Sequence, residues 1–442
     1  LAGAGASSGM AMAHWEIQGW MILILGWVFV PFYTRSMVYT MPEFLERRYN
    51  PQSRTILSVI SLVSYVLTKV AVTVYAGGLV FQQVFGIKEL WGIDFFWIAA
   101  IGLVVLTALY TIFGGMKSVL YTSVLQTPIL LLGSLIILVL GFKELGGWDE
   151  MMRVCGAVTV NDYGDTMTNL IRSNDDANFP WLGALIGSAI IGFWYWCTDQ
   201  FIVQRVLSGK NEMEARRGTI FGAYLKLLPV FLFLIPGMIA FALHQKYIGA
   251  GGEGFLPMLA NGTANADAAF PTLVAKLLPA GVKGLVVCGI LAALMSSLAS
   301  LFNSSAMLFT IDFYKRFRPE TPEKKLVGIG QVATVVIVIL GILWIPIMRS
   351  VGDVLYTYLQ DVQSVLAPGI AAAFLLGICW KRTSAQGGMW GLIAGMVIGL
   401  TRLGAKVYYS NAGEVADSTF KYLFYDMNWL FFCGWMFLFC II

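Results

Sequence analysis

The chain has 442 residues, of which 58% are hydrophobic and only 12% are charged, and its mean hydropathy is +0.75. An ordinary soluble domain carries about 25% charged residues, so this composition excludes a globular protein that folds in water. Such a chain needs the lipid bilayer as its solvent and partner. The formal net charge of +4 follows membrane topology, so we expect no nucleic acid as a partner.

Long apolar runs follow one another along the chain. Spanning the hydrocarbon core takes about 20 apolar residues in a helix. The runs that qualify, or nearly do, are residues 17–32, 56–85, 95–113, 119–140, 181–203, 218–243, 284–309, 327–347, 355–380 and 387–403. No strand-like alternation of the barrel type appears, so the sequence predicts an all-α integral membrane protein. Residues 1–9 and 429–442 are expected to be partial spans of a longer protein.

The loops between these runs differ in charge. If the loop 40–54 is cytoplasmic, the inner loops hold most of the lysines and arginines, and the outer loops hold most of the acidic residues. A positive-inside bias favours this orientation. Two long polar connections, 141–180 and 245–283, then become extracellular loops.

Four charged residues lie in or near predicted spans: Glu16, Lys69, Asp199 and Lys226. A charge inside a span is costly unless it faces a cavity or a partner, so each one is a functional hypothesis. For Glu16 the alternative is an interfacial position. For Asp199 it is pairing with polar neighbours such as Arg205 near the cytoplasmic end, and for the two lysines it is a structural role.

Glycine supplies a second pattern. Residues 1–9 are glycine-rich and form a poor helix, but they suit close packing against neighbours. Gly187 and Gly192 precede the triplet Trp194-Tyr195-Trp196. Broken helices in secondary transporters expose backbone carbonyls to ions and substrate, while the alternative is close helix packing through small residues.

Serine supplies a third pattern, in the run 284–309. On a helix, Ser296, Ser300 and Asn303 share one face. Hydroxyl and carbonyl oxygens are the hard ligands that a small alkali cation prefers. The alternative is that these hydroxyls bond carbonyls one turn back.

Several motifs resemble those of one family. They are WYWCTDQFIVQRVLS at 194–208, YTMPEFLERR at 39–48, FGG at 113–115, LKL at 225–227, SSL at 296–298 and WKR at 380–382. Their order and spacing from residue 1 to about 403 resemble the sodium/solute symporter family, in its sodium–glucose cotransporter-like sugar branch.

The resemblance implies the LeuT-like fold of five-plus-five inverted-repeat helices in a single transmembrane domain, residues 1–442. The first repeat would cover 1–140, incomplete at its start, and the second 181–380; residues 381–442 would be additional, incomplete C-terminal helices. It also implies a multi-pass protein of the plasma membrane that is not an enzyme.

The resemblance also implies roles for individual residues. Polar groups around the sugar would be Glu16, Lys69, Lys226 and Gln360, with Tyr195 under the sugar ring and Trp196 beside it. The outer hydrophobic gate would be Leu1, Trp15 and Tyr356. Sodium, the coupling ion, would bind Ser296, Ser297 and the carbonyl of Ala293.

The implied function is secondary active transport, in which inward sodium movement drives uptake of a hexose-like sugar by alternating access. Lys69 and Lys226 leave open an anionic cargo such as a monocarboxylate, and inositol or an amino acid is a further alternative. Ser123 stands where sugar-carrying relatives have an aspartate, and Gly192 where they carry a longer side chain. These departures leave open a sodium-conducting sugar sensor, while Ala299 suggests one sodium per cycle. A membrane-embedded enzyme is the remaining alternative.

Overall fold

A computed structural model describes residues 1–259, 262–351, 355–411 and 418–442, without the side chains of residues 17, 110, 112–119, 122, 125, 348–351, 355–357 and 411. The fold is helical, and its one described sheet is a two-stranded hairpin of β1 (Glu89–Leu90) and β2 (Ile93–Asp94). The sequence prediction of an all-α membrane protein is therefore confirmed.

The helices of the first part of the chain are α1 (Ala2–Ser8), α2 (Ala11–Glu16), η1 (Ile17–Gly19), α3 (Trp20–Ile24), η2 (Leu25–Phe29), α4 (Val30–Ser36), α5 (Met41–Arg48), α6 (Pro51–Ser64), η3 (Tyr65–Val70), α7 (Ala71–Phe85), α8 (Phe95–Leu145) and α9 (Trp148–Gly156). Those of the middle part are α10 (Trp181–Gly192), η4 (Phe193–Thr198), α11 (Gln200–Leu207), α12 (Glu212–Leu225), η5 (Val230–Leu234), α13 (Ile235–Gly249), η6 (Ala266–Ala268) and α14 (Ala269–Leu277). The last part holds α15 (Ala280–Met307), η7 (Leu308–Tyr314), α16 (Lys315–Phe317), α17 (Glu323–Val351), α18 (Leu355–Cys379), α19 (Ala385–Asn411), α20 (Thr419–Lys421), η8 (Tyr422–Asp426) and α21 (Trp429–Ile441).

The predicted spans correspond to long apolar helices. Within the described residues, 9 helices are long and apolar enough to cross a membrane, or up to 10 if the bent pair Thr419–Asp426 and Trp429–Ile441 is one span. The predicted runs 95–113 and 119–140 both fall within α8. The predicted outer loops are not wholly irregular, because α9 lies in the first and α14 in the second.

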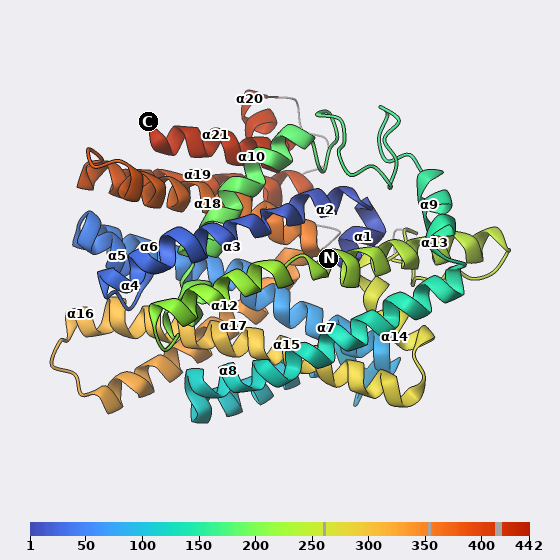
Figure 1. Ribbon diagram of the computed structural model, residues 1–442, viewed down its shortest axis with the longest axis horizontal. Helices are drawn as coiled ribbons and strands as arrows, with labels where there is room; N and C mark the ends of the chain where they lie inside the picture. Colours follow the sequence, from blue (N-terminus) through green and yellow to red (C-terminus); the bar gives the residue numbers. More distant parts are fainter. Residues whose placement is uncertain (260–261, 352–354, 412–417) are drawn as a thin grey trace.

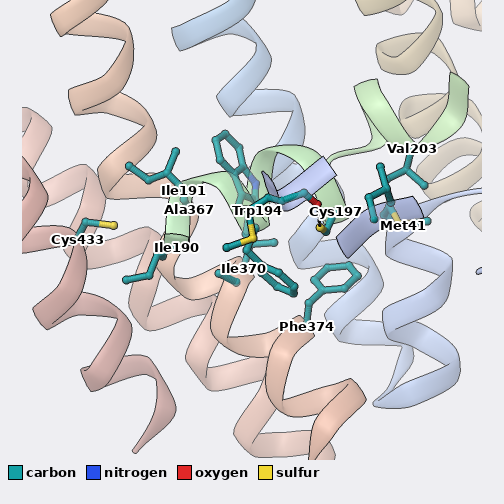
Figure 2. Close-up of a cluster of buried hydrophobic side chains, with 14 of the residues drawn as sticks. Met41, Ile190, Ile191, Trp194, Cys197, Val203, Ala367, Ile370, Phe374 and Cys433 are labelled. Atoms are coloured by element: carbon teal, nitrogen blue, oxygen red, sulfur yellow. Dashed lines mark hydrogen bonds between the residues drawn. The ribbon is translucent and has the colours of Figure 1, made fainter. Parts of the chain in front are cut away.

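The long helices run roughly side by side (Figure 1). In this view α18, α19 and α21 lie along one edge and α8, α15 and α17 along the opposite edge. Between the edges, a buried apolar cluster joins α10, η4 and α18, where Ile191 and Trp194 meet Ala367, Ile370 and Phe374 (Figure 2). This core fixes η4 between the helices that carry the predicted site.

Residues 1–9 form a helix that packs closely, as their small side chains predict. Helix α1 lies against η5 and α13. A Cβ atom on Gly5 would overlap the carbonyl oxygen of Leu234, and one on Gly237 would overlap the carbonyl oxygen of Ala2. Backbone therefore meets backbone at this contact, and only glycine fits.

Gly237→Ala is expected to destabilise the protein by about 1–3 kcal/mol, the usual cost of overpacking. The methyl group would push α1 away from α13. Thermal unfolding of the purified protein measures the loss. Gly218→Ala on α12 is the matched control, because a Cβ there meets no atom within 4 Å; equal melting temperatures for the two variants would contradict the close contact.

Of the two alternatives for Gly187 and Gly192, a helix break and close helix packing, the structure favours close packing. Helix α10 runs through Gly187 and ends at Gly192, where the chain passes directly into η4. A Cβ on Gly187 would lie 2.6 Å from Cδ2 of Leu430, and one on Gly192 would lie 3.1 Å from Cγ of Met21. These glycines serve close helix packing, and the break comes later, at Asp199.

Candidate functional site

Three of the predicted site residues, Lys69, Tyr195 and Trp196, lie on two π-helical segments, η3 and η4. Such segments are often found at functional sites, because the wider turn leaves some backbone groups without their usual partners. Segment η3 carries Tyr65 and Lys69, and η4 carries Tyr195 and Trp196. At the end of η4 the hydroxyl of Tyr33 donates a 2.8 Å hydrogen bond to the carbonyl oxygen of Cys197.

Asp199 occupies the break between η4 and α11. Its backbone is extended, with φ −76° and ψ 125°, and its carboxylate accepts a 3.0 Å hydrogen bond from the backbone N–H of Phe201. An aspartate is a strong N-cap because it satisfies one of the free N–H groups that begin a helix. Asp199 therefore ends the helical segment η4 and begins α11.

Lys69 and Asp199 form a buried ion pair. Their side chains are 9% and 3% exposed. The hydroxyl of Tyr65 donates a 2.8 Å hydrogen bond to Asp199. The ammonium of Lys69 also lies 4.8, 4.9 and 4.3 Å from the ring centroids of Tyr65, Tyr195 and Phe201, distances at which cation–π attraction operates. Asp199 thus pairs with Lys69, whereas the sequence pointed to its polar neighbours near Arg205.

Glu16 and Lys226 form a second ion pair, with side chains 2% and 18% exposed. Glu16 is therefore buried within the protein against its partner Lys226. Lys226 caps the C-terminal end of α12, and its ammonium lies 5.8 Å from the ring centroid of Trp196. The rings of Trp196 and Tyr195 are in turn 4.9 Å apart at 81°. The two ion pairs are therefore joined through the aromatic pair into one cluster.

Gln360 enters from α18, which packs against η3 and η4. Two residues earlier, the hydroxyl of Tyr358 donates a 3.1 Å hydrogen bond to the carbonyl oxygen of Leu67 on η3. Gln360 is buried at 5% exposure. Among the described residues, neither its Oε1 nor Nε1 of Trp196 has a hydrogen-bond partner. Buried polar atoms without a partner are uncommon, and these two are an acceptor and a donor of the kind that a hydroxyl group can meet.

The predicted outer gate is partly described. Trp15 is fully buried and Leu1 packs against the same apolar cluster, which also includes Tyr195 and Trp196. The ring of Trp15 meets that of Trp429 at 5.1 Å. The side chain of Tyr356 lies outside the described residues. Leu1 and Trp15 therefore share an apolar cluster with two of the predicted sugar residues, Tyr195 and Trp196.

The predicted sodium residues lie on α15. Ser296 is buried and its hydroxyl is 2.5 Å from that of Ser123 on α8, while Ser297 is exposed and Ala293 is half-buried. The guanidinium of Arg205 donates a 3.5 Å hydrogen bond to the carbonyl oxygen of Ser296. Hydroxyl and carbonyl oxygens thus gather here beside a basic group.

The other members of the serine face hold helices together. Nε2 of Gln204 donates a 3.2 Å hydrogen bond to the carbonyl oxygen of Ser300, whose hydroxyl accepts from Arg205. Asn303 donates to the carbonyl of Ala299 one turn back, at 3.1 Å. Ser300 and Asn303 therefore have structural partners, and the candidate ion site narrows to Ala293, Ser296 and Ser297.

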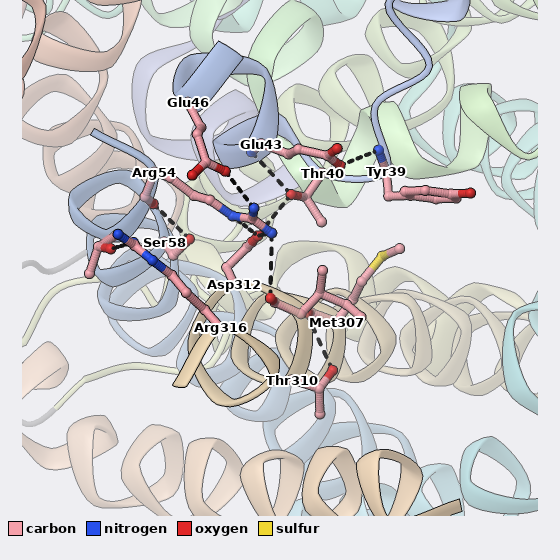
Figure 3. A network of polar contacts seen from close by, with 12 residues as sticks. Tyr39, Thr40, Glu43, Glu46, Arg54, Ser58, Met307, Thr310, Asp312 and Arg316 are labelled. Carbon is pink, nitrogen blue, oxygen red and sulfur yellow. Dashed lines mark hydrogen bonds and ion pairs between the residues drawn. The ribbon is translucent and has the colours of Figure 1, made fainter. Parts of the chain in front are cut away.

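A polar network that the sequence analysis missed lies at the predicted cytoplasmic end (Figure 3). Asp312 on η7 is fully buried and accepts hydrogen bonds from Nε of Arg54 at 2.8 Å and from the hydroxyl of Thr40 at 3.0 Å. Arg54 also pairs with Glu46 at 2.6 Å. The network ties η7 to α5 and α6. In the sequence, Asp312 follows closely after the apolar run 284–309. A charged residue at the end of an apolar run was the feature that could have indicated this network.

A second missed group joins α18 to α19. Asp361 pairs with Lys406 at 2.5 Å and lies 4.0 Å from Arg402. Arg402 is fully buried and donates a 2.6 Å hydrogen bond to the carbonyl of Met427 at the bend before α21. This group holds the residue next to Gln360, so it anchors α18 beside the site.

Known proteins share this sequence and fold. The family model "Sodium:solute symporter family" matches residues 1–395. The human sodium/myo-inositol cotransporter 2 is 38% identical over 416 residues, covering 91% of this chain and 61% of that protein. The Danio rerio sodium/glucose cotransporter 4 is 36% identical over 448 residues, covering 98% of this chain and 67% of that protein. The chain thus spans about 61% of the length of the first of these relatives.

A solved structure agrees on the fold. The substrate-bound outward-open state of a Na⁺-coupled sialic acid symporter superposes with a TM-score of 0.73 at 20% identity, covering 100% of this chain and 83% of that chain. The expected LeuT-like helical fold is therefore confirmed. Given the family match over residues 1–395 and these relatives, the chain belongs to the sodium:solute symporter family.

Proposed function

We propose that the protein is a secondary active transporter of the plasma membrane, in which inward sodium movement drives uptake of a hexose-like sugar. The observation that carries the proposal is the buried cluster of two ion pairs and two aromatic rings, formed by Lys69, Asp199, Glu16, Lys226, Tyr195 and Trp196. Family membership and the sugar and inositol transport named for the relatives support it. Residues 1–140 and 181–380 are proposed as the two repeats.

The chemistry of the cluster suits a neutral polyhydroxylated ring. A sugar presents hydroxyl groups at its edge and C–H groups on its faces. Gln360 and Trp196 offer an acceptor and a donor without other described partners, and Tyr195 can cover a ring face. Carboxylates and ammonium groups form the stronger, charge-assisted bonds to hydroxyls.

An anionic cargo is disfavoured by the same geometry. The ammonium groups of Lys69 and Lys226 are each neutralised by a carboxylate, Asp199 and Glu16. A monocarboxylate would add a negative charge to a site that is already balanced. Inositol stays open, because it carries hydroxyl groups without a charge and the human relative transports it by name.

Sodium is proposed to bind Ser296, Ser297 and the carbonyl of Ala293. One ion per cycle is proposed, since Ala299 has no hydroxyl to offer. The ion would raise the affinity for sugar and the sugar would raise the affinity for sodium by the same factor, because binding coupling is reciprocal. The membrane potential would add about 2.3 kcal/mol per charge for each 100 mV.

The test is uptake of labelled solute by proteoliposomes that contain the full-length protein, with and without an inward sodium gradient. The panel comprises glucose, galactose and myo-inositol. Gradient-dependent uptake that is lost in Gln360→Ala and in Ser297→Ala would support both sites. Sugar-evoked current without uptake would favour a sensor, and no response to sodium would overturn the coupling.

Ser123→Ala is expected to raise the sodium concentration for half-maximal uptake about fivefold, since one hydrogen bond is worth about 1 kcal/mol. The hydroxyl of Ser123 orients that of Ser296. Sodium titrations of uptake measure the effect. Thr127→Ala on the same helix is the control, because the hydroxyl of Thr127 bonds only the carbonyl of Ser123 among the described contacts. An unchanged sodium titration in Ser123→Ala would mean that Ser123 is not part of the sodium site.

A further inference from the structure

An apolar groove of about 820 Å³ lies on the outside of the helix bundle, and none of the candidate transport-site residues lines it. One wall is a continuous stripe along α17, at positions 325, 328, 329, 332, 333, 336, 337, 340, 343, 344 and 347. These positions recur every three or four residues, so they form one helix face. The opposite wall is Leu62, Val63, Val66 and Leu67 of α6 and η3, with Phe309 of η7.

The groove has one charged end. Lys325 is the only charged side chain among its described lining residues, and it is exposed. The adjoining segment 315–325 has five basic residues, Lys315, Arg316, Arg318, Lys324 and Lys325, against two acidic ones, Glu320 and Glu323. Arg316 donates a 2.8 Å hydrogen bond to the carbonyl of Pro51 at the start of α6. Basic residues therefore outnumber acidic ones in the segment that leads to the Lys325 end of the groove.

The half of the groove nearest Lys325 is as long as one lipid leaflet. Helices rise 1.5 Å per residue, so the whole stripe from Lys325 to Ile347 extends about 33 Å, close to the 30 Å hydrocarbon core, and its part from Lys325 to Val336 extends about 16 Å. Gly328 leaves room just inside the mouth, because a Cβ there would meet no atom within 4 Å. Val332 and Val336 beyond it are 65% and 49% exposed. An acyl chain fits this half of the groove in length and polarity.

We propose that an anionic phospholipid of the inner leaflet binds this groove. Its phosphate pairs with Lys325, and one acyl chain lies along Gly328, Val332 and Val336 against Leu62 and Phe309. The basic end of the groove complements the negative surface of the cytoplasmic leaflet, and Lys325, which pairs with the phosphate, should contribute about 1 kcal/mol. The lipid would brace α17 against α6 and η7, independently of the transported solute.

The test is native mass spectrometry of the purified full-length protein, titrated with phosphatidylglycerol or phosphatidylcholine. We expect one phosphatidylglycerol to bind tightly. Its affinity should fall about fivefold in Lys325→Gln, the factor that corresponds to one lysine charge near the headgroup. Lys324→Gln is the matched control, since this neighbouring lysine is exposed but does not line the groove.

The variant Gly328→Leu tests how much the apolar groove contributes to lipid binding, separately from the surface charge. Its side chain would fill the space below the mouth and leave every lysine in place, so phosphatidylglycerol binding should fall in this variant too. Circular dichroism melting verifies that each variant is folded. Equal binding of phosphatidylcholine, equal loss in Lys324→Gln and Lys325→Gln, or full binding in Gly328→Leu would each overturn the proposal.

Discussion

Lys69→Met is expected to destabilise the protein by about 3–5 kcal/mol, the usual cost of removing one partner from a buried ion pair. The carboxylate of Asp199 would stay buried, with only the hydroxyl of Tyr65 and the N–H of Phe201 as described hydrogen-bond donors. Sugar uptake should be lost as well, because the ammonium joins the break at Asp199 to the ring of Tyr195. Thermal unfolding in detergent and proteoliposome uptake measure the two effects.

Two further variants distinguish the loss of stability caused by breaking the buried ion pair from the loss that any such substitution causes. Arg153→Met removes an exposed pair with Glu150, in which the arginine side chain is 71% exposed, and should leave the melting temperature nearly unchanged, because exposed pairs contribute little to stability. The double variant Lys69→Met/Asp199→Asn removes both charges and should cost less than the sum of the single variants. Additive losses would mean that the two charges do not interact.

The membrane spans could be predicted from sequence because each one is a local property of about 20 residues. The run 327–347 is a typical case, since α17 covers Glu323–Val351. The family motifs likewise drew attention to Tyr195, Trp196 and the lysines. The structure brings Glu16, Lys69, Tyr195, Trp196 and Lys226 into one cluster.

The partners of the charged residues could not be predicted, because they depend on which helices pack together. Asp199 has Arg205 nearby in sequence, but its partner Lys69 is 130 residues away. The glycines were ambiguous for a different reason. A small residue has the same appearance in sequence whether it breaks a helix or lets another helix approach, and Gly187 does the latter against Leu430. Asp199, a capping residue within an apolar run, was the better signal for the break.

Asp312→Asn is expected to cost about 3–5 kcal/mol of stability and to reduce uptake. The side chain of Asp312 is 0% exposed and that of Arg54 is 14% exposed, so the guanidinium would keep only Glu46 as an anionic partner among its described contacts. The amide would also weaken the hydrogen bond from Thr40. Since this network joins η7 to α5 and α6, its loss should loosen the predicted cytoplasmic end of α15. Thermal unfolding of the purified protein measures the change.

The control makes the same chemical change in an exposed ion pair. Glu214→Gln removes the pair with Arg217, in which the two side chains are 57% and 71% exposed, and should cost under about 1 kcal/mol because such pairs are solvated. If Arg54→Met restores part of the stability that Asp312→Asn loses, the cost comes from an uncompensated buried charge. Similar melting temperatures for Glu214→Gln and Asp312→Asn would mean that water reaches Asp312 and that the network does not hold η7 in place.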